Sequence, residues 1–193
     1  MTKEYLEVPE EYLLCRDWEE PMVLPKNRME AYHVYGNPGT SGTLDHQWER
    51  ENMVVARNLP GPKKKLYVHR LVEPYLREAL ARCESIGVVD YIQRMGCFNF
   101  RPQRHDWSRP LSYHAFGAAL DINPPDNRSW YRTKYLKKKR RRGPVPEPFT
   151  KDWYDYWPYG LPEEFVMAFE SVGWSWGGRW KRYIDPMHFQ LVG

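Results

Sequence analysis

The segment Ser112–Asn123, SYHAFGAALDIN, places the strictest local demand on the fold. His114 and Asp121 are seven residues apart, which corresponds to about 23 Å along a straight strand and about 10 Å along a helix. Two short side chains can meet at one point over such a span only if the chain reverses between them. Gly117 is the residue that can adopt the backbone of that turn. We therefore predict a tight turn that leads into a short strand at Leu120–Asn123.

Both ends of this segment carry chemistry that suits a metal ion, because imidazole nitrogen and carboxylate oxygen are ligands of zinc. A second segment, DPMHF at residues 185–189, has Asp185 and His188 three residues apart, so that one turn would place them on the same side. In a hydrolytic zinc site, a histidine binds the metal while a carboxylate reaches the metal-bound water. Taken alone, the pair His114 and Asp121 is more commonly a surface histidine and a strand-end aspartate. The pair Asp185 and His188, taken alone, is more commonly a structural aspartate beside a packed histidine.

The composition limits the class of protein. Leu, Ile, Val and Phe make up only about a fifth of the 193 residues, which is near the level of disordered chains. The 14 Tyr and 9 Trp supply the missing apolar area and favour a compact globule with a groove. No apolar run approaches the roughly 20 residues that span a bilayer. Three scattered cysteines, Cys15, Cys83 and Cys97, are too few for a disulfide framework and indicate thiols in a reducing cytosol.

The chain is predicted to consist of an irregular N-terminal arm, residues 1–62, packed on one domain, residues 63–193. The arm is rich in turn-forming Pro and Gly, and its start, MTKEYLEVPEEYLL, lacks the basic and apolar regions of a signal peptide. We therefore expect synthesis in the cytoplasm. Helical spacing predicts a helix at Val68–Ile86, with Pro74 marking its start or a kink. Val88 and Val89 are expected in a strand, and residues 124–160 in a loop insertion rich in basic residues, Pro and Trp.

Four stretches resemble the zinc peptidases of bacteria and phages that cleave peptidoglycan stem peptides, namely D-alanyl-D-alanine carboxypeptidases and L-alanyl-D-glutamate endopeptidases. These stretches are CFNFRP at residues 97–102, SYHAFGAALDIN, GWSWGGRW at residues 173–180, and DPMHF. They occur in the family's order. The resemblance implies an α+β fold, with a small antiparallel sheet, flanking helices and a zinc site on the open face of the sheet, as in the signalling domain of hedgehog proteins.

The resemblance also assigns roles to single residues. His114, Asp121 and His188 match the three protein ligands of one Zn²⁺ ion. Asp185 matches the general base that later passes its proton to the leaving amine, and Arg101 matches the arginine that neutralises the developing oxyanion.

Two further positions are implied as substrate contacts. Ser112 matches a position near the substrate, and Trp180 belongs to an aromatic group that could line the groove, although core packing explains most such rings. His105 is another candidate contact, for which an exposed loop position is the simpler interpretation. The remaining histidines, His33, His46 and His69, show no ligand spacing and are interpreted as structural or solvated.

The function implied is zinc-dependent hydrolysis of a peptide bond in peptidoglycan stem peptides. Several carboxypeptidases of the family carry Glu where this chain has Asp185, so we expect an L-alanyl-D-glutamate endopeptidase that acts as a phage or prophage lysin on the cell wall after release. The alternatives are a D-alanyl-D-alanine carboxypeptidase with the same mechanism and, more distantly, a non-catalytic zinc-containing binding domain. We expect a monomer without a transmembrane segment.

The net charge of +4 comes from one loop. Residues 132–142, RTKYLKKKRRR, hold eight basic side chains, and the rest of the chain has 21 basic and 25 acidic ones, a net charge of −4. Such a balance does not provide the broad basic face that duplex binding needs, so no specific nucleic-acid partner is expected. Attraction of this loop to anionic wall polymers is the hypothesis that the charge supports.

Overall fold

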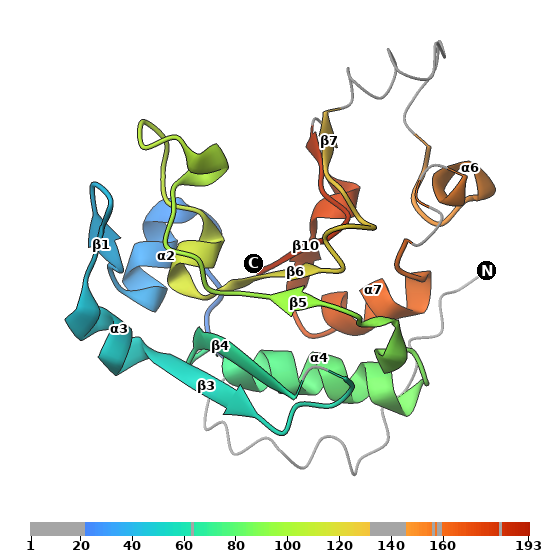
Figure 1. Ribbon diagram of the computed structural model, residues 1–193, viewed down its shortest axis with the longest axis horizontal. Helices are drawn as coiled ribbons and strands as arrows, with labels where there is room; N and C mark the ends of the chain where they lie inside the picture. Colours follow the sequence, from blue (N-terminus) through green and yellow to red (C-terminus); the bar gives the residue numbers. More distant parts are fainter. Residues whose placement is uncertain (1–21, 63, 132–145, 156, 158–159, 182) are drawn as a thin grey trace.

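The computed structural model describes residues 22–62, 64–131, 146–155, 157, 160–181 and 183–193. Its centre is a four-stranded antiparallel sheet with the strand order β5-β6-β10-β8 (Figure 1). The strands are β5 (Met95–Gly96), β6 (Ala119–Ile122), β8 (Trp174–Trp176) and β10 (His188–Leu191). The expected α+β class with a small antiparallel sheet is confirmed, and so is the strand after Gly117.

Two helices, α4 (Glu73–Ser85) and α7 (Glu163–Glu170), pack against each other beside the sheet (Figure 1). In α4, Leu76, Leu80 and Cys83 recur on one buried face. Glu73 and Pro74 form its first turn, so the helix begins at Glu73, one residue before the proline, and not at Val68. The residues from Val68 were expected in the helix, but Lys65–His69 form strand β4, whose pairing with β3 outweighs the helical spacing.

Helix α7 covers one face of β10 with aromatic side chains. Phe165 and Phe169 stack on each other, and both contact the ring of Phe189 in β10. Because side chains alternate along a strand, this contact leaves His188 and Gln190 on the opposite face. The sheet thus has one face in the core and one available for a site.

Residues 22–62, expected as part of an irregular arm, contain regular elements. They form α2 (Arg28–Tyr35), the short pair β1 (Gly39–Thr40) and β2 (Thr43–Leu44), α3 (His46–Asn52) and β3 (Met53–Arg57). β3 pairs with β4 across the predicted boundary at residue 62. Ala31 and Tyr35 belong to the same core cluster as the sheet, and the Tyr35 hydroxyl donates to the Leu191 carbonyl at 2.9 Å. The many Pro and Gly residues lie between elements that tertiary packing stabilises.

The remaining elements are short. The 3₁₀ turns are η1 (Val89–Tyr91), η2 (Gln103–His105), η3 (Tyr113–Phe116) and η4 (Gly177–Arg179), and β7 (Trp130–Tyr131) pairs with β9 (Tyr183–Ile184). The strand expected at Val88 and Val89 is therefore wrong, because the chain turns directly after Gly87, which has a φ of 74°.

The expected insertion at residues 124–160 contains β7 and the short helix α6 (Lys151–Tyr154). The basic loop 132–142 lies outside the described residues, and so does Cys15. Among the helices that the structure describes, none is both long and apolar enough to cross a bilayer.

Candidate metal centre and its pocket

The turn η3 carries His114 to the sheet. Ser112 caps the turn, with its hydroxyl accepting from the His114 N–H at 3.4 Å, and Gly117 ends it in the left-handed region with a φ of 64°. A Cβ atom at Gly117 would lie 2.7 Å from both the His69 backbone nitrogen and the Met53 Cε atom. The predicted reversal at Gly117 is therefore confirmed, and its close packing explains why no larger residue fits.

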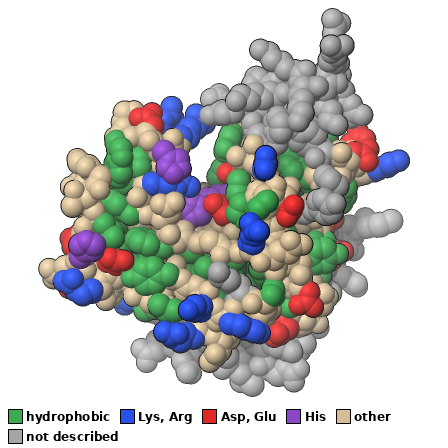
Figure 2. Space-filling model, in the orientation of Figure 1, with side chains coloured by type: hydrophobic (Ala, Val, Ile, Leu, Met, Phe, Trp, Pro, Cys, Tyr) green, Lys and Arg blue, Asp and Glu red, His purple; other side chains and the backbone are tan. Residues whose placement is uncertain are grey.

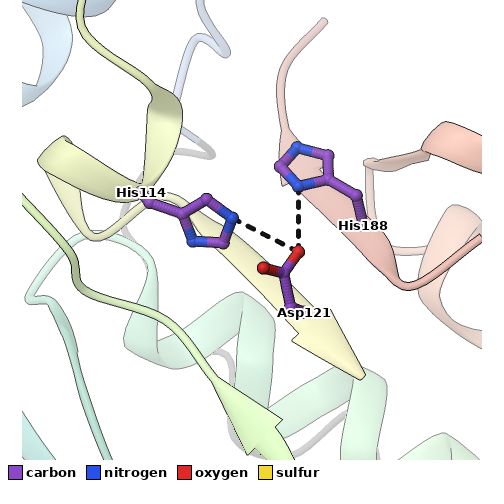
Figure 3. A group of neighbouring side chains, drawn as sticks. All are labelled: His114, Asp121 and His188. Carbon is purple, nitrogen blue, oxygen red and sulfur yellow. Dashed lines mark hydrogen bonds and ion pairs between the residues drawn. The ribbon is translucent and has the colours of Figure 1, made fainter. Parts of the chain in front are cut away.

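The register of the sheet brings the second segment to the first. Asp121 on β6 stands directly opposite His188 on β10, and the two side chains share the open face. The ligand atoms that His114, Asp121 and His188 offer all lie within 4.8 Å of one another (Figure 3). The His114 Nε2 and His188 Nδ1 atoms are 3.3 Å and 3.2 Å from the Asp121 Oδ1 atom. Three residues that are distant in sequence thus form one cluster that could hold a metal ion.

Neighbouring groups orient both imidazoles with a nitrogen toward the cluster. The His114 Nδ1 atom lies 2.6 Å from the Cys97 carbonyl oxygen, to which it donates. Its Nε2 atom is buried and, apart from its approach to Asp121, has no hydrogen-bond partner among the described residues. The His188 Nε2 atom lies 3.2 Å from the Gln190 Oε1 atom, which leaves Nδ1 toward Asp121. An outer hydrogen bond of this kind is what fixes the tautomer of a metal-binding histidine, and the buried His114 nitrogen that faces Asp121 fits a zinc ligand.

The electrostatics favour the protonation states of Asp121 and His188 that a metal requires. Burial opposes the ionisation of Asp121, but His114 and His188 outweigh it and lower the pKa of its carboxyl below the usual range. Burial also lowers the pKa of His188, which favours the neutral imidazole. A carboxylate and neutral imidazoles are the forms that bind cations.

Asp185 lies beside the cluster on the turn that precedes β10. The His188 N–H donates to the Asp185 carbonyl at 3.0 Å, so the predicted single turn between these residues is confirmed. The backbone N–H of Asp185 donates to the Gly177 carbonyl at 3.0 Å, and a Cβ atom at Gly177 would lie 2.6 Å from the Asp185 carbonyl oxygen. The glycines of GWSWGGRW thus allow η4 to hold this turn closely.

The side chain of Asp185 is poised between its charged and neutral forms. Its Oδ1 atom is buried, and no described residue forms a hydrogen bond with it. Burial and the negative charge of Asp121 raise the pKa of Asp185 to about 7, against the opposite effects of His114 and Arg101. Such a group can accept and release a proton near neutral pH.

The cluster opens into a pocket of about 430 Å³, a size that suits a small ligand or a short peptide segment. Arg101, Ser112, Trp180 and His105 line it together with the cluster and Asp185, so every residue predicted for the site faces the same space. In Figure 2 a hollow opens between the part around α2 and the part around β7, and histidine and acidic side chains are visible where it narrows.

The aromatic groups divide between the core and the pocket. Trp174 and Trp176 are buried, and the Trp176 indole donates to the Pro186 carbonyl at 2.8 Å, which supports the Asp185 turn from behind. Trp180 instead lies in the pocket wall, with its ring centroid 5.3 Å from that of His188.

Sequence reasoning missed two features of the site. Gln190 orients His188, and its position two residues further along the strand, on the same face, was a usable signal. Arg28 also lines the pocket, although it lies on α2, more than 70 residues before Arg101. No local pattern marks Arg28, because only the tertiary structure brings α2 to the sheet.

Comparison with known proteins agrees with this geometry. Residues 106–191 match a protein-family model described as D-alanyl-D-alanine carboxypeptidase. No curated protein and no solved structure matches the chain. The matched segment contains the His114, Asp121 and His188 cluster and Asp185, whereas Arg101 lies just before it. Over residues 106–191, this chain is therefore similar to the D-alanyl-D-alanine carboxypeptidase family of peptidases.

Proposed function

We propose that this protein is a zinc peptidase that hydrolyses a peptide bond in peptidoglycan stem peptides. The observation that carries the proposal is the meeting of two His nitrogens and a carboxylate oxygen within 4.8 Å at the base of a pocket. A carboxyl group with a pKa near 7 and an arginine face the same space. The family match supports the same class of reaction.

His114, Asp121 and His188 would hold the ion in this proposal. Bound there, zinc would supply a water molecule of lowered pKa and would polarise the carbonyl of the scissile bond. Groups of the protein itself position these ligands. The Cys97 carbonyl and the Gln190 amide hold the two imidazoles in orientation, and the surrounding core keeps the cluster rigid.

Asp185 takes the role of general base. Its carboxylate accepts the proton of the attacking water, and the protonated carboxyl then delivers that proton to the amine that leaves. A pKa of about 7 suits both directions of transfer at neutral pH.

Arg101 takes the role of the cation that stabilises the oxyanion. It lines the pocket, and its positive charge lowers the pKa of Asp185. Its backbone is held by a hydrogen bond in which the Ser112 N–H donates to the Arg101 carbonyl at 3.0 Å. A fixed positive group near the developing negative charge lowers the barrier of acyl transfer. Ser112 and Trp180 are proposed to contact the peptide from the pocket wall.

The bond that we favour is that between L-alanine and D-glutamate, and the biological role is that of a phage or prophage lysin acting on the wall after release. The aspartate at position 185 supports this choice, because it resembles the endopeptidases more than the carboxypeptidases. The second candidate is removal of the terminal D-alanine, which the description of the matching family model favours.

Digestion of purified muropeptides, followed by mass spectrometry, tests the proposal. Release of the stem peptide from L-alanine identifies the endopeptidase, and loss of one alanine identifies the carboxypeptidase. Zinc content is measured on the same samples, with His188→Ala as the variant that should lose the metal. Stoichiometric zinc with no cleavage of any muropeptide would contradict the proposal and would favour a binding domain.

A further inference from the structure

Arg28 is an unexplained cation in the wall of the pocket. Its guanidinium carbon lies 4.0 Å from the centroid of the ring of Tyr113, the residue that precedes His114. Its Nη1 atom is buried and finds no hydrogen-bond partner in the part of the chain that the structure describes. A buried guanidinium nitrogen without an acceptor costs free energy, and none of the residues that the structure describes supplies that acceptor.

The acid nearest to Arg28 along the chain is engaged elsewhere. Glu30 accepts from the Lys26 N–H at 2.9 Å and from the Asn27 side-chain amide at 2.7 Å. Asn27 in turn caps α2 by accepting from the backbone of Met29 and Glu30. The carboxylate of Glu30 thus directs these hydrogen bonds to the start of α2 and not to Arg28.

The position of Arg28 is rigidly determined. Helix α2 is anchored by the buried residues Ala31 and Tyr35, and the Tyr35 carbonyl accepts from the Trp48 indole at 2.8 Å. The ring of Tyr113 covers one face of the guanidinium. Tyr113 also takes part in a side-chain hydrogen bond with Arg28. The N–H groups of arginine lie in the plane of the guanidinium, and this geometry suits a carboxylate, which can accept two parallel hydrogen bonds.

We propose that Arg28 is a specificity-determining residue that binds the free carboxylate of the substrate residue on the C-terminal side of the cleaved bond. This inference rests on the proposed function, and it applies to both candidate bonds. A terminal D-alanine ends in a carboxylate. D-glutamate has two carboxyl groups, of which only one continues the peptide. Arg28 lies outside the matched segment 106–191, so the residue would be a contribution of this chain's own N-terminal part.

The test measures equilibrium binding to the zinc-loaded full chain carrying Asp185→Asn, so that the peptides stay intact. The probes are an acylated D-Ala-D-Ala peptide and an L-Ala-D-Glu stem peptide, each with the free carboxylate and with the same group as a carboxamide. A charged hydrogen bond of the usual strength corresponds to a preference of about 10- to 100-fold for the carboxylate form. Adding Arg28→Gln should remove this preference while binding of the carboxamide form stays unchanged.

Matched variants separate this role from a structural one. Arg50→Gln removes a positive charge from the exposed surface of α3 and should keep the full preference. Arg28→Lys keeps the charge but not the paired donors, so it should keep a reduced preference, and it serves as the test if Arg28→Gln does not fold. The pair of peptides that shows the preference identifies which carboxylate is bound.

The inference is overturned if the preference survives in Arg28→Gln, if both forms lose affinity equally, or if neither form binds. Hydrolysis by the native chain is scored separately. Cleavage without an Arg28-dependent preference would overturn this inference but not the peptidase activity. An Arg28-dependent preference without cleavage would overturn the peptidase activity but not the binding of a carboxylate by Arg28.

Discussion

At the scale of single residues, Asp185 has the most consequential environment. Its carboxyl is largely buried beside the anionic Asp121, which raises its pKa to about 7. We expect Asp185→Asn to retain zinc, because the three ligand side chains are untouched, and to lower the rate of stem-peptide cleavage by about 10²- to 10⁴-fold. Metal analysis and steady-state kinetics on one muropeptide measure the two effects.

The matched control for this variant is Asp155→Asn, which changes an exposed aspartate next to α6. It should keep both zinc and the native rate. Cleavage at the native rate by Asp185→Asn would show that another group takes the proton.

At the scale of elements, the turn between η3 and β6 decides whether the site exists. Gly117 has a φ of 64°, and a Cβ atom there would lie 2.7 Å from the His69 backbone nitrogen. We expect Gly117→Ala to lower the free energy of unfolding by more than the roughly 1–2 kcal/mol of a left-handed alanine alone, because the close backbone contact adds a clash. It should also weaken zinc binding, since His114 moves with the turn.

Gly87 offers a direct comparison. Its φ is 74°, and a Cβ atom there would meet nothing within 4 Å. Gly87→Ala should therefore show the conformational cost only, with zinc binding unchanged. Denaturant unfolding of the two variants measures the difference, and equal losses would argue against the packing of Gly117.

At the scale of the whole molecule, His69 ties the N-terminal elements to the rest. It is fully buried, with its Nδ1 atom accepting from the Leu71 N–H at 3.1 Å and its Nε2 atom donating to the Tyr35 carbonyl at 3.1 Å. Burial lowers the pKa of His69 to about 4 from the ordinary 6.5. Between these values the unfolded chain binds more protons than the folded one, so stability falls as the pH drops from about 6.5 to 4, by on the order of 3 kcal/mol in full.

The contribution of His69 is measured as the difference in stability between the native chain and a His69 variant. This is necessary because the raised pKa of Asp185 makes the folded state more stable as the pH falls from about 7 toward the usual pKa of an aspartate, which opposes the effect of His69. The free energy of unfolding is measured against pH for the native chain and for His69→Gln. The acid-dependent loss should be smaller in His69→Gln, whereas His33→Gln, which changes an exposed histidine, should keep the native profile. Identical profiles for the native chain and His69→Gln would contradict the buried neutral state.

Local spacing alone determined the parts of this protein that covalent geometry controls. The chain had to reverse between His114 and Asp121 for the two side chains to meet, and Gly117 was the residue able to make that turn. The three-residue spacing of Asp185 and His188 allowed one turn to place them on the same side. Only the tertiary structure decided the rest. The β6–β10 register placed His188 opposite Asp121, β4 took Val68 and His69 from the start of the predicted helix, and α2 brought Arg28 into the pocket. Those outcomes depend on contacts between residues far apart in the chain, where the packing of a shared core outweighs local preference.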